Sequence, residues 1–147
     1  MGDWLTPEQR SRNMAAIRSR GTKPEVRLQN LVRELLPRNK VALHPDLPGR
    51  PDLFVPGLGL AVFMDGCFWH ACPKHGRVPQ DNSAYWEPKL VRTHTRDREA
   101  VTLLHRLSLT TVRIWEHELR GNASPARRKL KCAIARTVNR TMGRRTA

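Results

Sequence analysis

Acidic, cysteine and histidine residues crowd into one segment of the chain, residues 50–75. Within it, two apolar runs flank the turn-forming residues 56–59, and this order predicts a β-hairpin. Asp52 opens the first run and Asp65 closes the second, so we expect antiparallel pairing to bring the two carboxylates together. Mg²⁺ prefers such hard oxygen ligands, usually one or two carboxylates with substrate phosphate and water. The pattern indicates a site for phosphodiester chemistry; the simpler role for each acid alone is to cap a turn.

His70 lies near the same end of the predicted hairpin. A histidine there suits a general base, because imidazole gains and loses a proton near neutral pH. Asp97 lies on a long helix expected downstream, and it is the natural partner to orient that ring if the helix packs over the site. The alternative for His70 is a further metal ligand beside the neighbouring cysteines.

Zinc-type ligands follow at a C-x4-C-x2-H spacing, Cys67, Cys72 and His75, and His117 comes just after a predicted strand. A structural zinc site is closed by four nitrogen or sulfur ligands in a tetrahedron. We expect these four residues to bind Zn²⁺ and to pin a loop, rich in Gly and Pro, that has little else to hold it. The alternative is two buried cysteines and two surface histidines. Cys132 is expected on an ordinary apolar helix face.

Four of the eight aromatic residues fall in this loop and at the start of the next helix: Phe68, Trp69, Tyr85 and Trp86. Core aromatics would be spread over several elements, whereas a cluster beside a catalytic loop suits stacking on bases or wedging between them. A place in the core stays open for part of the cluster, and for Tyr85 above all.

The net charge is +14, and its distribution along the chain is uneven. Residues 51–86 carry −1, whereas residues 122–147 carry +8. Basic segments around a nearly neutral acidic site favour a nucleic-acid partner; a basic protein from a composition-biased genome is the simpler alternative. No apolar run approaches the ~20 residues that a membrane span requires. We therefore expect a cytoplasmic, nucleoid-associated monomer with no membrane partner.

Hydrophobic spacing and helix-breaking residues predict helices over residues 7–19, 24–36, 82–107 and 124–138, and further strands over 41–44 and 110–115. This order indicates an α/β fold with a mixed sheet between helices. We expect one domain over residues 1–147, with a core at about 8–121 and a basic C-terminal helix and tail at 122–147. Glu25, in the first turn of the second helix, is either a surface acid that favours the helix dipole or an acid that reaches the active site.

The very-short-patch mismatch repair endonucleases are the family that the chain resembles, over about residues 8–121. The resemblance rests on four segments: LPGRPDLFV, VFMDGCFWHACPKHG, W-x2-K followed by RDR, and RIWEHELRG. It implies a restriction-endonuclease-like fold with a structural zinc site. It also implies an enzyme that uses Mg²⁺ to nick duplex DNA 5′ of the T in a T:G mismatch, the product of 5-methylcytosine deamination, and so starts repair. Mismatch-repair proteins or a DNA-cytosine methyltransferase are then expected partners.

The resemblance also implies a role for each active-site residue. Asp52 would be the principal Mg²⁺ ligand, with the backbone carbonyl of Met64 as a second. His70 would be the general base and Asp97 its partner, and Glu25 would be an accessory of the active site.

DNA contacts and metal ligands carry over in the same way. The resemblance implies an aromatic wedge made of Phe68, Trp69 and Trp86. Arg92 and Arg96, on the polar side of the long helix, are expected to contact DNA. The four zinc-type residues would be the structural zinc ligands.

The chain also departs from the family pattern. Asp65 stands where the best-known pattern has a histidine, so two carboxylates would bind the metal and His70 would be the sole base. Thr93 replaces an Asn often found ahead of the Arg-Asp pair, which alters one expected contact. Two other functions stay open: a site- or structure-specific endonuclease without mismatch preference, and a zinc-stabilised DNA-binding module without catalysis.

Overall fold

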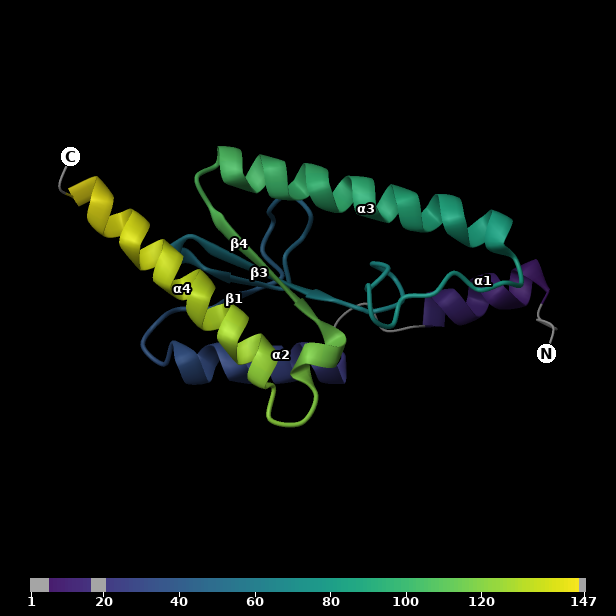
Figure 1. Cartoon of the computed structure of the whole chain (residues 1–147), viewed down its shortest axis with the longest axis horizontal. Helices are drawn as coiled ribbons and strands as arrows, with labels where there is room; N and C mark the ends of the chain where they lie inside the picture. The colour runs from purple at the N-terminus through teal and green to yellow at the C-terminus, as the bar shows by residue number, and fades with distance from the viewer. Residues whose placement is uncertain (1–5, 17–20, 146–147) are drawn as a thin grey trace.

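A four-stranded mixed sheet lies between helices in the computed structural model, which describes residues 6–16 and 21–145 (Figure 1). The strand order is β1-β2-β3-β4. The helices are α1 (Pro7–Ala16), α2 (Lys23–Leu35), α3 (Ser83–Arg106) and α4 (Ser124–Arg145), and the strands are β1 (Ala42–Leu43), β2 (Leu53–Val55), β3 (Leu60–Asp65) and β4 (Thr110–Trp115). Two short 3₁₀ helices, η1 (Pro56–Leu58) and η2 (Glu116–Leu119), complete the order. The expected α/β architecture is confirmed.

The predicted hairpin is formed by β2 and β3. The two strands pair antiparallel, with Leu53 opposite Val62 and Val55 opposite Leu60. The turn between them is η1, which ends at Gly59 in the left-handed region at φ 58°. Glycine enters that region at little steric cost, so the sequence fits the tight reversal.

The chain crosses from β3 to β4 through α3. The two strands pair in parallel, from Leu60 opposite Thr110 to Asp65 opposite Trp115. A parallel pair requires a long connection, and the 24-residue α3 supplies it. Consequently β3 and β4 end at the same edge of the sheet, where the chemistry-bearing loop begins.

Alternation along the strands divides the core between the two faces of the sheet. Leu60 and Val62 of β3 belong to the larger cluster, which α2, η2 and α4 cover. Ala61 and Phe63 belong to the smaller cluster, with Leu104 of α3. Figure 1 shows α3 on one side of the sheet and α2 and α4 on the other. Alternate residues of β3 and β4 therefore point toward different helices.

One helix end differs from the sequence-based expectation, and another expected end lies outside the described residues. Of the helix expected over residues 7–19, α1 covers 7–16, and 17–20 lie outside the described residues. The expected end of the last helix at 138 is wrong, because α4 runs to Arg145. Residues 139–145 contain no proline, and arginines near the C-terminus favour the helix dipole, so nothing ends the helix earlier. Among the described helices, none combines the length and apolar character that crossing a membrane requires.

Candidate active site

Asp52 lies just before β2, at the open end of the hairpin. Its Oδ2 accepts a hydrogen bond from the backbone N–H of Met64 at 2.7 Å. Its own backbone N–H donates to the carbonyl of Val62 at 3.0 Å. The two bonds join backbone and side chain to β3, so the carboxylate is fixed relative to the sheet.

Glu25 and His44 share a cluster with Asp52, in which one ligand-type atom of each residue lies within 4.8 Å of the others. Glu25 is 1% exposed, so the expectation of a surface acid is wrong. Its Oε2 accepts the backbone N–H of Gly21 at 2.9 Å. Its Oε1 is buried and lies 2.7 Å from Nε2 of His44, but it accepts no well-aligned hydrogen bond. The cluster therefore holds a buried carboxylate oxygen that lacks a proper donor.

The electrostatics of this cluster disfavour negative charge. Burial raises the pKa of the Asp52 carboxyl above its usual value, and the nearby Glu25 carboxylate raises it further, while the N–H of Met64 lowers it. Two carboxylates face one imidazole here, and a divalent cation is the partner that would relieve their repulsion. The oxygen-rich donor set and the unpartnered Glu25 oxygen fit such an ion.

Asp65 is paired with Arg113 of β4. The guanidinium donates to both carboxylate oxygens, at 2.6 and 2.8 Å, and Asp65 is only 3% exposed. The parallel neighbour strand thus supplies a cation that engages both oxygens of Asp65. Asp65 is still near enough to Asp52 that its charge helps to raise the pKa of the Asp52 carboxyl. Metal binding by Asp65 stays a prediction, and its carboxylate would first have to leave Arg113.

His70 and Asp97 meet as the sequence predicts. Nδ1 of His70 lies 2.6 Å from Oδ2 of Asp97, which reaches over from α3. Asp97 also lies 3.3 Å from the Arg113 guanidinium, and His70 lies 3.9 Å from Asp65. In the neutral tautomer that donates from Nδ1 to Asp97, Nε2 is left as an acceptor.

Aromatic rings cluster beside this pair. Phe68 contacts Trp69 and Trp86 edge-on, with ring centroids 5.0 and 5.1 Å apart. Tyr85 packs on Trp86 at 5.0 Å and is 50% exposed, so it is not a core residue. Nζ of Lys89 lies 5.2 to 5.4 Å from the ring centroids of Trp69, Tyr85 and Trp86. These rings lie partly open at the surface, with a cation over them.

A groove of about 690 Å³ connects the aromatic cluster to the histidine–aspartate pair. It is lined by Gly49, Arg50, Trp69, His70, Lys89, Thr93, Arg96 and Asp97. Arg96 is exposed there, and Arg92 is exposed along the same helix, where a separate cavity joins the two arginines. Basic and aromatic groups thus line a path that ends at His70.

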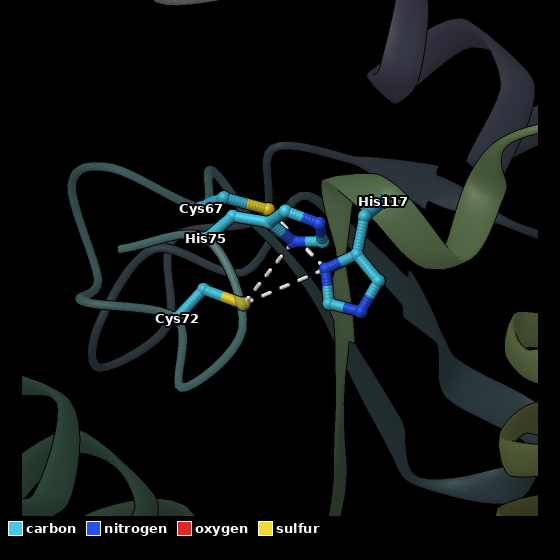
Figure 2. A group of neighbouring side chains, drawn as sticks. All are labelled: Cys67, Cys72, His75 and His117. Carbon is cyan, nitrogen blue, oxygen red and sulfur yellow. Dashed lines mark hydrogen bonds between the residues drawn. The ribbon is translucent and has the colours of Figure 1, made fainter. Parts of the chain in front are cut away.

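Cys67, Cys72, His75 and His117 converge on one point (Figure 2). Nδ1 of His117 lies 3.3 Å from Sγ of Cys67 and 3.5 Å from Sγ of Cys72, and Nδ1 of His75 lies 3.9 Å from the latter. Ligands at ordinary Zn–S and Zn–N distances stand about 3.6 Å apart in a tetrahedron. The four residues therefore have the spacing of a zinc site, with three from the loop and one from η2.

The ligand pKa values in this cluster are shifted unequally. Burial raises the pKa of the Cys67 thiol. At Cys72 burial acts upward too, but backbone N–H groups of residues 74–76 stabilise the thiolate, and the pKa is lowered. Burial, with His75 nearby, lowers the pKa of His117. A thiolate and neutral imidazoles are the forms that bind a metal.

Sequence reasoning assigned no role to three residues at these sites, His44, Lys89 and Arg113, although the segment W-x2-K contains Lys89 and RIWEHELRG contains Arg113. The spacing of Lys89 after Tyr85 and Trp86 was a usable signal, because residues three and four apart share a helix face. Arg113 gave a weaker signal, since its alternation with Val112 and Ile114 only placed it on the opposite face of the sheet. His44 gave none, because its role depends on a kink.

The histidine–aspartate pair and the groove lined by basic and aromatic groups fit an enzyme that acts on a nucleic acid. A sequence profile of the family DNA mismatch endonuclease Vsr matches residues 2–75. The chain is 43% identical over 113 residues to the type II nicking enzyme V.NaeI of Lentzea aerocolonigenes, covering 74% of this chain and 68% of that protein. It is 35% identical over 122 residues to V.XorIIP of Xanthomonas oryzae, covering 81% and 88%. It is 36% identical over 124 residues to the DNA mismatch endonuclease Vsr of Escherichia coli, covering 82% and 78%.

The chain therefore belongs to the Vsr DNA mismatch endonuclease family. It is a DNA-nicking hydrolase, and its mixed sheet with flanking helices fits the restriction-endonuclease-like fold of that family.

Proposed function

We propose that this enzyme nicks duplex DNA 5′ of the T in a T:G mismatch left by 5-methylcytosine deamination, with Mg²⁺ as the catalytic ion. The observation that carries the proposal is the groove that joins the aromatic cluster to the His70–Asp97 pair. Hydrolysis of a phosphodiester requires charge neutralisation and a base. Recognition of a mismatch requires a group that unstacks bases.

Asp52 and Glu25 are the carboxylates that would hold Mg²⁺. A bound Mg²⁺ would supply positive charge at the scissile phosphate. Asp52 is fixed by the Met64 N–H, and a bound cation would offset the burial that disfavours its anionic form. Glu25 contributes the buried oxygen that lacks an aligned donor.

His70 is the proposed base that removes a proton from the attacking water. Nε2 is the free acceptor, because Nδ1 faces Asp97 at 2.6 Å. Asp97 holds the ring in this orientation and stabilises the positive charge that the imidazole gains. Arg113 in turn holds Asp97 at 3.3 Å, so the orientation is anchored to β4.

Phe68, Trp69 and Trp86 are the proposed wedge. Their edge-on contacts make one rigid group that can enter a base step without rearranging. A T:G wobble pair is weaker than a matched pair, so the cost of unstacking it is lower, and this difference would select the substrate. Exposed Arg92 and Arg96 would hold the phosphates on either side.

The Cys67, Cys72, His75 and His117 cluster is the proposed structural zinc site. It would tie the wedge-bearing loop to the end of β4, so the aromatic group keeps its place relative to His70. Purified protein should contain one zinc per chain by mass spectrometry, and Cys72→Ser should lose it. A full zinc complement in the Cys72→Ser variant would contradict this assignment.

Strand-specific nicking tests the proposed function. One end-labelled duplex carries a single T:G pair, and matched T:A and C:G duplexes of the same sequence are controls. Mg²⁺ is omitted by dialysis rather than removed with EDTA, because a strong chelator would also extract zinc. The enzyme should nick only the T strand of the mismatched duplex, only with Mg²⁺, and not as Asp52→Ala.

Other outcomes lead to other functions. Nicking of all three duplexes would replace the proposal with an endonuclease that has no mismatch preference. Tight binding without any nicking in Mg²⁺ would leave a DNA-binding role and would contradict the assigned active site.

A further inference from the structure

His44 is held at the Asp52 cluster by its backbone. Its φ of 46° lies in the left-handed region, which is uncommon for a residue other than glycine. Its N–H donates to the Asp52 carbonyl at 3.0 Å, and this bond continues the β1–β2 pairing past its last strand residues. The kink and the bond together direct the imidazole of His44 at Glu25, with 2.7 Å between Nε2 and Oε1.

The spacing of these atoms suits neighbouring ligands of one ion. Adjacent ligands of an octahedral ion with 2.0–2.1 Å bonds are about 3 Å apart. The imidazole nitrogen and the Glu25 oxygen are 2.7 Å apart, and all three ligand-type atoms, including that of Asp52, lie within 4.8 Å. A single ion can therefore contact all three side chains with small adjustments.

Glu25 is the independent sign that a ligand is missing from this cluster. It is 99% buried, and its Oε1 accepts no well-aligned hydrogen bond although His44 Nε2 is near. A histidine that served only to satisfy Glu25 would aim an N–H at this oxygen. A buried carboxylate oxygen left without its donor costs free energy unless another cation reaches it.

We propose that His44 is a nitrogen ligand of the catalytic cation, beside Glu25 and Asp52. The inference rests on the proposed metal-dependent function and adds a ligand to it. Imidazole suits transition metals better than Mg²⁺, whereas carboxylates suit Mg²⁺ and Mn²⁺ alike. The site should therefore bind Mn²⁺ more tightly than Mg²⁺, and this selectivity should depend on His44.

Pulsed EPR with Mn²⁺ as the probe tests the assignment directly. The full chain, carrying zinc, is mixed with a pre-nicked T:G duplex so that no turnover occurs. Nitrogen-14 coupling to bound Mn²⁺ reports an imidazole ligand. His44→Asn is the variant, because Asn tolerates the left-handed region but is too short to place nitrogen at the ion. His70→Asn is the matched control, which removes the other nearby imidazole.

The wild type and His70→Asn should both show the coupling, and His44→Asn should lose it. Titration should show Mn²⁺ affinity falling at least about tenfold in His44→Asn, with a smaller change for Mg²⁺. Coupling that survives in His44→Asn would overturn the proposal, and so would Mn²⁺ bound by the wild type without coupling. Failure of the wild type to bind Mn²⁺ would overturn it as well.

Failure of the His44 assignment in the Mn²⁺ experiment can be distinguished from failure of the proposed function in the nicking experiment. Selective nicking of T:G duplex by the wild type in Mg²⁺ would stand even if His44 proved not to be a ligand. Loss of mismatch selectivity with the coupling intact would count against the proposed substrate alone.

Discussion

Two acidic clusters occur at the same edge of the sheet, and they are neutralised differently. In the first, Glu25 and Asp52 face a single imidazole, and one buried oxygen lacks an aligned donor. In the second, Asp65 and Asp97 face the guanidinium of Arg113, with His70 bound to Asp97 at 2.6 Å. The first cluster has an excess of negative charge, and the second contains its own cation.

The difference separates two chemical roles. A cluster with excess negative charge attracts an external cation. Until that cation binds, the repulsion between the carboxylates destabilises the folded protein. A network that contains its own cation, as Arg113 does for Asp65 and Asp97, can hold its geometry and orient a base. Asp52 and Asp65 flank one hairpin, yet their neighbours decide their roles: α2 brings a second acid to Asp52, whereas β4 brings an arginine to Asp65.

The largest expected effect is that of Asp52→Asn on nicking. The amide keeps the shape and the acceptor for Met64 N–H but loses the charge that holds the cation. Stabilisation of transition-state charge by a metal is worth several kcal/mol, so the single-turnover rate should fall about a thousandfold or more. A rate within tenfold of the wild type would show that the first cluster does not hold the catalytic ion.

The same variant should be more stable without Mg²⁺. The pKa of Asp52 is raised by burial, so the folded protein binds more protons than the unfolded chain between the usual value of 3.8 and the folded-state pKa. The free energy of unfolding therefore falls as the pH rises through that interval. The Asp52→Asn variant does not lose stability in this way, because its amide does not ionise. Its gain in Tm should be complete above the folded-state pKa and should vanish as the pH falls below 3.8.

His70→Ala should have the next largest effect on the rate. Removing a general base typically lowers a rate by about 10²–10⁴-fold. Added imidazole should restore part of the activity if the ring acts as a base, and it should not rescue Asp52→Asn. Mn²⁺ binding should survive in His70→Ala, because the ring belongs to the second cluster. Loss of Mn²⁺ binding would show that His70 also holds the ion, so that the two clusters form a single site.

Arg113→Met should be the most destabilising change of the three. It leaves Asp65 buried without its cation, and breaking a buried pair in this way costs about 3 kcal/mol or more. The double variant Asp65→Asn, Arg113→Met should be more stable than Arg113→Met alone, as measured by urea unfolding of zinc-loaded protein. Additive losses would mean that the pair is not coupled.

Local sequence patterns predicted much of this arrangement. The hairpin followed from apolar runs around a glycine turn, and the zinc-type cluster followed from the spacing of Cys67, Cys72 and His75. The pairing of His70 with Asp97 was predicted on the condition that the long helix packs over the site, and the two side chains do meet. Each of these features depends on one local sequence motif or on the packing of one helix against the sheet.

The remaining features depend on contacts that no local pattern encodes. Arg113 meets Asp65 only through the parallel register of β3 and β4, which joins residues 48 apart in sequence. Glu25 reads as an ordinary acid in a first helical turn, and only the packing of α2 beside the hairpin buries it. His44 joins the cluster through a left-handed kink that no local sequence pattern requires.

The smallest expected effect is that of arginine substitutions in the basic helix α4 on the salt dependence of DNA binding. It tests whether α4 contacts DNA away from both acidic clusters. Arg128 and Arg136 are exposed on it, whereas Arg127 is paired with Glu34 at 2.7 Å. Each phosphate contact contributes about one unit to the slope of log K against log salt concentration. Arg128→Gln and Arg136→Gln should each reduce the magnitude of the slope by up to about one, and Arg127→Gln should change it less. Unchanged slopes in both variants would show that these two arginines of α4 do not contact phosphates.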